Sequence, residues 1–357
     1  MKKAPEQDYS IESGLNEAGF ARYEALFAEN GMPRQEHSLN WRYTRNPTEG
    51  TSVVNFALSR ETGDTGAVYA VMGVDLLHDG QRRPGAQSLD TLTDAQHRRK
   101  GLFPYLARHC YNHLAKSGCL AVYGFPNANS CPTFKKHLGW TIYGQVDFLI
   151  RPLRTGYFVE GLLARAGLGW LGKAVDLQLP VARPRPARVT LRPVTRFGAR
   201  HEAVWREVAG HARIAVDRSA DYLNWRLFDH PDAARYRIVE AVAGEEVLGF
   251  AAWRVERKHN GQIGYLMECL ARDGRDDLRK LLLRHALHDM KAAHADLVMA
   301  WSPPHQPGTQ SLRRCGFLPM PERLRPIDLY WGAKIFAPGV SFGATDWYIS
   351  YLDSDTI

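Results

Sequence analysis

The stretch S-L-D-T-L-T-D-A-Q-H-R-R-K-G-L-F-P-Y-L-A-R-H, residues 88–109, decides the fold predicted for this chain. It predicts a strand over Ser88–Thr93, and apolar residues at helical spacing predict a helix over Leu102–Lys116. The turn between them, Gln96–Gly101, is basic and contains His97, Arg98, Arg99 and Lys100. The stretch therefore reads as a strand, a cationic turn and a helix.

This basic turn suits a dianion such as a pyrophosphate. A helix N-terminus presents N–H groups without intrahelical partners and a partial positive charge, and the basic side chains add to that charge. Gly101 lets the backbone approach a ligand closely because it has no side chain. The alternative is an ordinary surface turn that opens a helix with basic residues.

The elements that follow favour a phosphate site. An apolar run covers Leu120–Phe125, a short helix is predicted over Cys131–Leu138, and a strand over Trp140–Ile150. This order resembles the acyl-CoA-binding core of the GNAT superfamily of N-acyltransferases, with Arg98–Phe103 in place of its R-x-x-G-x-G/A pyrophosphate loop. The resemblance implies an α/β (α+β) fold with a mixed central sheet flanked by helices, and acetyl-CoA or another acyl-CoA as co-substrate.

The resemblance also implies roles for individual residues. Asp90 is a candidate base, and Lys135 stands where many members carry the tyrosine that protonates the departing CoA thiolate. Phe103 departs from the family pattern, which has a small residue there, and should change how tightly the loop wraps the phosphates. The residues expected to hold acyl-CoA are Leu92, Thr93, Asp94, His97, Arg98, Arg99, Lys100, Gly101, Leu102, Phe103, Asn127 and Asn129.

Structural alternatives exist for several of these residues. Asp90 also fits a strand carboxylate that faces solvent or pairs with a nearby cation. Asn127 and Asn129 also suit helix capping and turn formation. In the binding role, backbone N–H groups of residues 92–94 would hold the pantetheine arm, and one of them would face the thioester oxygen.

Composition narrows the partners and the compartment. The chain has 357 residues, with 46 Lys and Arg against 38 Asp and Glu, so its net charge of +8 favours anionic partners. Basic residues are not interleaved with aromatics along one face, so no nucleic-acid partner is expected. The five cysteines lack metal-ligand spacing, which predicts reduced thiols, no metal and a cytoplasmic protein. The charged N-terminus, without a following apolar segment, predicts no secretory signal.

The second half of the chain repeats the plan of the first. L-N-W-R occurs at residues 39–42 and again at 223–226, and we expect a structural role for it because it recurs in both copies. Before these motifs, residues 1–12 are expected to be loosely attached, and a helix is predicted over Asn16–Asn30. Strands are predicted over Val53–Ser59 and Val68–Asp75.

The repeat predicts two tandem GNAT-like domains, 1–155 and 189–357, joined by an interdomain helix and Pro-rich linker over 156–188. Opposite the basic turn the second copy has Gly274–Asp277, whose two carboxylates would repel a pyrophosphate. The second domain is therefore expected to be degenerate and to hold no CoA. The apolar segment Tyr157–Leu177 is interrupted by charges and is expected to lie on the domain seam, with weak contact to a membrane face as the alternative.

These features predict an N-acyltransferase that moves an acetyl or short acyl group from acyl-CoA to a primary amine by direct attack. The tandem arrangement resembles bacterial enzymes that acylate nucleotide-linked amino sugars for polysaccharide biosynthesis. The alternatives are a peptidoglycan-type aminoacyl or peptide transferase, against which the intact basic turn argues, and a non-catalytic binding module of envelope assembly. The sequence leaves the acyl chain, the acceptor and the oligomeric state open.

Overall fold

The structure is a computed structural model, which describes all residues except 1–3, 49–50, 158–175, 184–188, 326 and 355–357. The described helices are α1 (Pro5–Asp8), α2 (Glu17–Glu29), α3 (Glu36–Leu39), α4 (Leu102–Lys116), α5 (Cys131–His137), α7 (Ala199–Ala209), α8 (Ala220–Leu223), α9 (Asp276–Ala292) and α10 (Thr309–Arg314). The described strands are β1 (Tyr9–Ser13), β2 (Val53–Ser59), β3 (Thr65–His78), β4 (Gln81–Thr93), β5 (Ala121–Gly124), β6 (Thr141–Gln145), β7 (Phe148–Pro152), β8 (Thr190–Pro193), β9 (Ile214–Val216), β10 (Tyr236–Ala243), β11 (Glu246–Lys258), β12 (Gly261–Ala271), β13 (Leu297–Trp301), β14 (Leu318–Pro319), β15 (Tyr330–Ile335) and β16 (Trp347–Tyr348).

The chain divides into two compact units, and each unit takes segments from both halves of the sequence. The first unit comprises Met1–Gln145, Asp229–Pro231 and Asp328–Ala344. The second unit comprises Val146–Phe228, Asp232–Ile327 and Thr345–Ile357.

Each unit contains one mixed sheet, and the two sheets exchange a strand. The order is β1-β2-β3-β4-β5-β15-β6 in the first unit and β14-β7-β13-β12-β11-β10-β8 in the second. Near the C-terminus, β15 pairs antiparallel with both β5 and β6. In return β7, which directly follows β6, pairs antiparallel with β13 and β14.

This exchange corrects two predictions. The single strand expected over Trp140–Ile150 is in fact two strands, β6 and β7, which belong to different sheets. The expected domain limits, 1–155 and 189–357, also fail, because residues 146–155 belong to the second unit and 328–344 to the first. The physical reason is that alternating apolar residues make a strand but do not select which sheet edge it pairs with.

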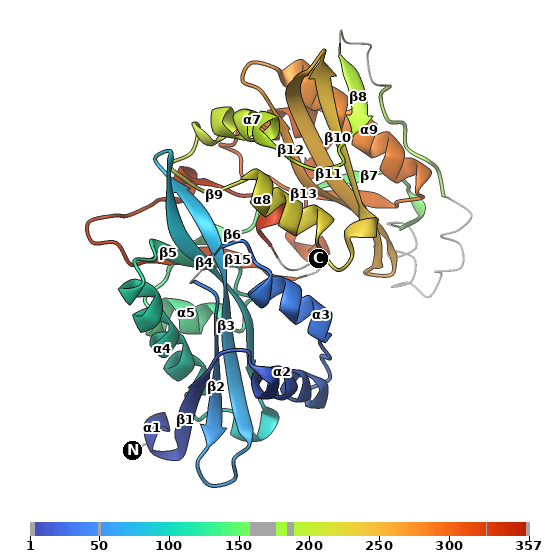
Figure 1. Cartoon of the computed structure of the whole chain (residues 1–357). Coiled ribbons are helices and arrows are strands. Elements are labelled where there is room, and N and C mark those ends of the chain that lie inside the picture. The colour runs from blue at the N-terminus through green and yellow to red at the C-terminus, as the bar shows by residue number, and fades with distance from the viewer. Residues whose placement is uncertain (1–3, 49–50, 158–175, 184–188, 326, 355–357) are drawn as a thin grey trace. The chain divides into compact units, whose positions relative to one another are not determined.

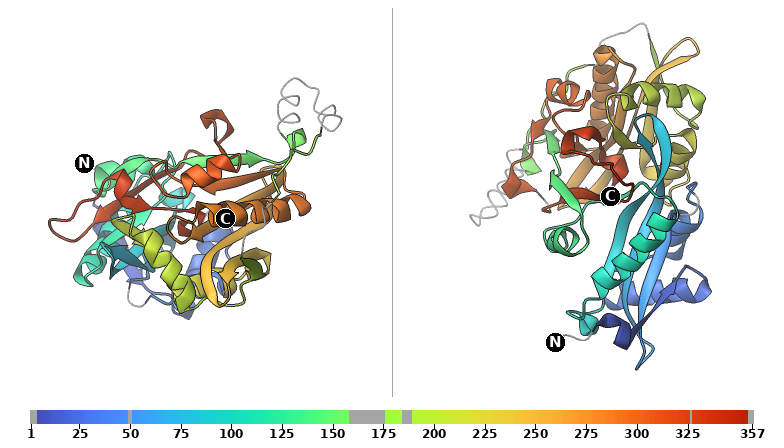
Figure 2. Two further views of the ribbon diagram at one scale, coloured as in Figure 1. Left: turned by 90° about the horizontal axis from the view of Figure 1, so that it is seen from above. Right: turned by 90° about the vertical axis from the view of Figure 1, so that its left-hand side faces the viewer.

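In the first unit, helices cover both faces of the sheet. Figure 1 shows α2 and α3 on one side of β2, β3 and β4, and α4 and α5 on the other. Figure 2, in its right-hand view, shows α4 lying along these long strands. The α2 face buries Tyr23, Phe27 and Leu39 against Phe56, and the α4 face buries Leu106 with its neighbours. Apart from the strand expected over Trp140–Ile150, the strands and helices predicted for this half are confirmed, most closely α4, which spans Leu102–Lys116 as expected.

The N-terminal segment is better ordered than the sequence suggests. Strand β1 pairs antiparallel with β2, and Tyr9 is buried. Loose attachment of residues 1–12 is therefore wrong for the described residues among them, because β1 forms the edge of the sheet.

The interdomain segment falls largely outside the described residues. Most of the predicted seam helix, Tyr157–Leu177, is in the undescribed range 158–175, and the end of the Pro-rich linker is in 184–188. Within the part of the chain that the structure describes, no helix combines the length and apolarity needed to cross a membrane.

Candidate functional site

Strands β4 and β5 begin as a parallel pair and then separate. Only Ala86, Gln87 and Ser88 pair with β5, opposite Val122–Gly124, although β4 continues to Thr93. On its other edge β4 carries a bulge, because its pairing with β3 shifts register between Ser88 and Thr91. The sheet is thus split on one side of residues 89–93.

A groove fills this split, with a cavity volume of about 620 Å³, which is within the usual size of small-molecule sites. Gly124 stands where the two strands part: a Cβ there would lie 3.0 Å from the carbonyl oxygen of Ser88 and 3.4 Å from the Trp140 ring. The lining residues come from β4, the basic turn, α4 and the β5–α5 region: Ser88, Leu89, Thr91, Leu92, Thr93, Arg98, Phe103, Gly124, Phe125, Pro126, Asn127, Asn129, Ser130, Thr133, Phe134 and Trp140.

The basic turn lies at one end of this groove. Gly101 has a φ of +79° and immediately precedes α4, so the turn needs glycine at this point. Arg98, Arg99 and Lys100 are exposed, and Arg98 lines the groove. The predicted pyrophosphate turn therefore opens onto the cavity, and Leu102 is buried in the core behind it.

Two members of the predicted set contact β1. Lys100 donates a hydrogen bond from Nζ to the Tyr9 hydroxyl at 2.9 Å, and that hydroxyl bonds His97 Nδ1 at 2.7 Å. His97 lines a second hollow, of about 580 Å³, together with Asp94 and residues of α2. His97 thus supports the turn from its far side and is absent from the lining of the groove.

Asp94 does not fit its predicted role. Its backbone N–H donates to the Gly66 carbonyl at 3.0 Å, so it is already engaged. Its carboxylate accepts from Gln96 N–H at 2.8 Å and from Asn30 Nδ2 at 3.1 Å. Burial opposes ionisation, but these hydrogen bonds outweigh it and the pKa of Asp94 is lowered. Asp94 shapes the turn. By the alternation of the antiparallel ladder, the Leu92 N–H also faces β3, whereas the Thr93 N–H faces away from it.

Asn127 shapes the start of α5. Its Oδ1 accepts from the backbone N–H groups of Asn129 and Ser130, each at 3.0 Å, and from the Ser130 hydroxyl at 3.2 Å. Asn129 is exposed and has no such capping role of its own. Both asparagines line the groove, so the capping and binding interpretations are compatible.

Asp90 is buried under two arginines. Its Oδ1 lies 3.0 Å from Arg34 Nη2, and its Oδ2 lies 2.6 Å from Arg42 Nη1 and 3.1 Å from the Tyr43 hydroxyl. Burial raises the pKa of Asp90, but Arg42 and Arg34 more than compensate and hold it below its usual value. A carboxylate so paired is a poor proton acceptor near neutral pH, which argues against the predicted role as general base.

Lys135 does not line the groove. It is exposed on α5, next to Phe134, which is buried and does line it. The position that carries a tyrosine in many GNAT proteins therefore supplies no proton donor to this cavity.

A chain of buried hydroxyls, which the sequence did not reveal, reaches the groove instead. Trp140 Nε1 donates to the Tyr111 hydroxyl, which bonds the Tyr69 hydroxyl, which bonds Ser88 Oγ, each at 2.9 Å. An indole N–H can only donate, so the Tyr111 hydroxyl accepts from Trp140, whereas in the two hydroxyl–hydroxyl bonds either oxygen can be the donor. The Ser88 hydroxyl ends this chain, and Ser88 lines the groove. The three links span 19 to 42 residues of sequence, so no local pattern could have shown them.

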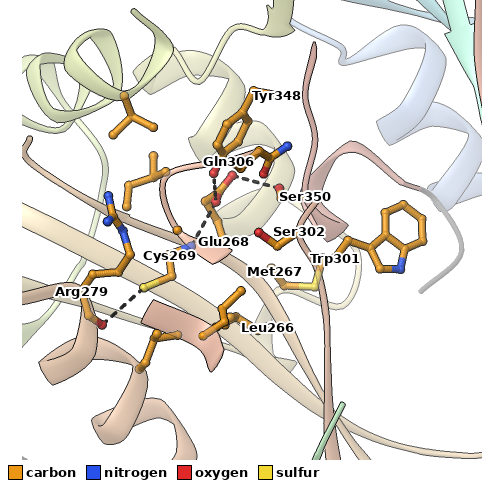
Figure 3. Close-up of a pocket in the computed structure, with 15 residues that line it drawn as sticks. Leu266, Met267, Glu268, Cys269, Arg279, Trp301, Ser302, Gln306, Tyr348 and Ser350 are labelled. Carbon is orange, nitrogen blue, oxygen red and sulfur yellow. Dashed lines mark hydrogen bonds between the residues drawn. The ribbon is translucent and has the colours of Figure 1, made fainter. Parts of the chain in front are cut away.

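The second unit repeats the split but not the cavity. Strand β12 pairs with β13 only over Ile263–Tyr265, and it too has a bulge, before Glu268. The space beside it has a volume of about 30 Å³, and the residues that line it include Trp301, Arg279 and Tyr348 (Figure 3).

The turn before α9 is closed by internal ion pairs. Arg275 contacts Asp277 at 3.0 Å, and Asp276 contacts Arg279 at 2.7 Å. Two carboxylates therefore stand at this helix N-terminus, where the first unit has basic side chains and an open cavity.

Comparison with known proteins supports the fold. No family model and no curated protein matches the sequence. Among solved structures, the chain is similar to Saccharomyces cerevisiae N-myristoyltransferase with bound myristoyl-CoA, at 15% identity and a TM-score of 0.57 over 93% of this chain and 85% of that one. It is also similar to a GCN5-related N-acetyltransferase from Anabaena variabilis, at 13% identity and a TM-score of 0.62 over 92% of this chain and 73% of that one. The predicted fold, two tandem GNAT-like α/β units, is confirmed.

Proposed function

We propose that this protein is an acyl-CoA-dependent N-acyltransferase with one CoA site, in its first unit. The observation that carries the proposal is the groove of about 620 Å³ in the split between β4 and β5, which opens beside a basic turn at a helix N-terminus. The solved structures with the same fold include one with bound myristoyl-CoA, which supports an acyl-CoA as the occupant.

In this proposal the pyrophosphate lies against residues 98–101 and the pantetheine arm runs along β4. The arm takes the place of the missing strand partner, so that the N–H group of Thr93, which faces away from β3, binds it. The acyl end then reaches the narrow end of the groove, between Ser88 and Gly124. There the Ser88 hydroxyl can donate to the thioester oxygen or to the departing thiolate as either gains negative charge.

The acceptor amine must be neutral to attack the thioester directly. Asp90 is already paired with two arginines, so we propose that it positions them and that the amine loses its proton to water. The reaction forms the amide C–N bond, breaks the C–S bond and returns one proton to the thiolate, which balances the transfer.

The proposed acceptor is a primary amine on a nucleotide-linked amino sugar. A basic chain suits such a substrate, because its diphosphate can pair with arginines while the hexose lies near the thioester. The alternatives are an aminoacyl or peptide transferase and a non-catalytic binding module. Acyl transfer to the free amino sugar as fast as to its nucleotide-linked form would contradict the diphosphate part of the proposal.

Calorimetric titration of the full-length chain with CoA tests the site. We expect one CoA per chain, and Gly101→Asp should abolish binding because it places bulk and charge against the pyrophosphate. Gly80→Asp is the matched control: Gly80 also has a positive φ, of +77°, but its Cβ position is open and it lies outside the groove. Two CoA molecules per chain, or none, would show the proposal to be wrong.

A further inference from the structure

The two halves of the chain share a pair of arginines as well as a fold. Arg34 precedes Arg42 by the same spacing that separates Arg218 from Arg226. The second member of each pair belongs to an L-N-W-R motif, and both motifs form a π-helical turn, Asn40–Thr44 and Asn224–Phe228. Each pair therefore occupies the same place in its own unit.

In the second unit this arginine pair holds the C-terminal segment. The Arg218 side chain is fully buried and binds both oxygens of Asp353, at 2.6 Å through Nη1 and 2.7 Å through Nη2. It also contacts the strand carboxylate Glu268 at 3.3 Å. Arg226 donates to the Ser354 carbonyl at 2.7 Å. Arg218 thus binds two carboxylates, Glu268 from strand β12 and Asp353 from the C-terminal segment.

In the first unit the corresponding arginine contacts one carboxylate within the part of the chain that the structure describes. Arg34 donates through Nη2 to Asp90, which is the strand counterpart of Glu268, and stacks on the Phe27 ring at 4.9 Å. No second anion contacts Arg34 among the described residues, and 41% of its side chain is exposed. A guanidinium carries five N–H donors, so several remain available for a fork-like contact with an oxyanion.

We propose that Arg34 binds an acidic group, a carboxylate or a phosphate, of the amine acceptor. This inference rests on the proposed acyltransferase function, because it assigns the acceptor's side of that site. Asp90 lies on β4 between two residues that line the groove, Leu89 and Thr91, and it contacts the α2 side of the sheet. An anion held at Arg34 therefore lies on that side, next to the strand along which the thioester is proposed to lie. The ion pair with Asp90 keeps the guanidinium oriented, as Glu268 does for Arg218.

The first test is calorimetric titration of the CoA-saturated, full-length chain with succinate and with inorganic phosphate, neither of which can react. We expect the protein to bind at least one of the two anions, and the stronger one identifies the acidic group. Arg34→Gln should weaken that binding about 10- to 100-fold, and Arg34→Lys should retain part of it as a point charge. Arg83→Gln, which removes an exposed arginine at the start of β4, should leave it unchanged.

The second test measures thiol release from acetyl-CoA with β-alanine, O-phosphoethanolamine and ethanolamine, which differ mainly in the acidic group. Arg34→Gln should raise KM for the preferred anionic amine by a larger factor than KM for ethanolamine or for acetyl-CoA. If the wild-type chain binds neither anion, or Arg34→Gln binds them as well as wild type, the inference is wrong. Failure to bind CoA itself would instead overturn the proposed function, so the two failures are distinguishable.

Discussion

The groove of the first unit and its counterpart in the second have the same backbone and opposite contents. Both lie where one strand of a parallel pair continues beyond the other, and both have a bulge at that point. In the first unit Gly124 ends the short strand and the cavity measures about 620 Å³, whereas in the second Trp301 ends it and about 30 Å³ remains. The fold provides a split sheet in both units, and the side chains around it decide whether a cavity remains open.

The strand carboxylates Asp90 and Glu268 also have similar positions in the two units but different surroundings. Asp90 pairs with Arg34, which is partly exposed, while Glu268 pairs with the buried Arg218 and also accepts from Tyr348 at 2.7 Å and Ser350 at 2.9 Å (Figure 3). In the second unit the C-terminal segment binds the arginine pair, through Asp353 and Ser354. That unit therefore uses its arginine pair to hold its own chain, whereas Arg34 of the first unit is partly exposed.

The largest effect should come from exchanging the residues that end the two short strands. Gly124→Trp should abolish CoA binding, because a side chain at this position enters the split next to Ser88 and Trp140. Trp301→Gly should lower the free energy of unfolding by about 3–5 kcal/mol through the cavity it leaves, and should create no CoA site beside Asp276 and Asp277. Calorimetry with CoA and urea unfolding check both. CoA binding by a folded Gly124→Trp variant would contradict the placement of the groove.

Removal of the strand carboxylate should lower the free energy of unfolding more in the second unit than in the first. Glu268→Gln should cost about 3–5 kcal/mol of unfolding free energy, because it leaves one side of the buried Arg218 without its charged partner. Asp90→Asn should cost less, since Arg34 can turn to solvent. Urea denaturation of the two variants measures the difference. Equal losses of unfolding free energy would show that the ion pairs of Asp90 are as well shielded from solvent as those of Glu268.

Charge reversal in the two turns should affect CoA only in the first unit. Arg98→Glu should weaken CoA binding about 10- to 100-fold, because a carboxylate would face the pyrophosphate. Arg275→Glu, at the corresponding turn of the second unit, is the matched control and should leave CoA affinity unchanged. Loss of affinity in the control variant would place phosphates at the second turn.

Ser88→Ala should lower kcat about tenfold with little change in KM for acyl-CoA, as expected when one donor to a developing charge is removed. Thr91→Val is the control, because the Thr91 hydroxyl already donates to the Leu89 carbonyl at 3.1 Å although the residue lines the groove. Burial raises the pKa of Tyr69 well above its usual value, so the hydroxyl chain should remain protonated at alkaline pH. Equal kcat values for both variants and wild type would remove Ser88 from the mechanism.

The smallest effect concerns pH. The pKa of Asp90 is lower in the folded protein than in the unfolded chain, so its contribution to stability is fully present above the unfolded value, about 3.9, and is lost as pH falls through the folded value. Between pH 5 and 3 the wild-type chain should therefore lose more stability than Asp90→Asn, in the range of about 1 kcal/mol. Parallel pH curves from urea melts would contradict the ion pairs described for Asp90.

The sequence by itself predicts the helices and strands of this protein and the basic turn between β4 and α4. The limits of α4 and α5, the strands around them and the repeat of L-N-W-R follow from spacing and turn residues, because neighbouring residues alone decide these features. The difference between the two turns was also visible, since Asp276 and Asp277 stand where the other half has cations.

Only the tertiary structure decided which sheet each strand joins and which groups face the groove. The exchange of β7 and β15, the burial of Asp90 under Arg34 and Arg42, and the hydroxyl chain to Ser88 all link residues far apart in sequence. Lys135 was expected in the site and lies outside its lining, since a position in a motif does not fix the direction of a side chain. Local patterns set the conformation of a segment, whereas partners across the fold determine what its side chains can bind.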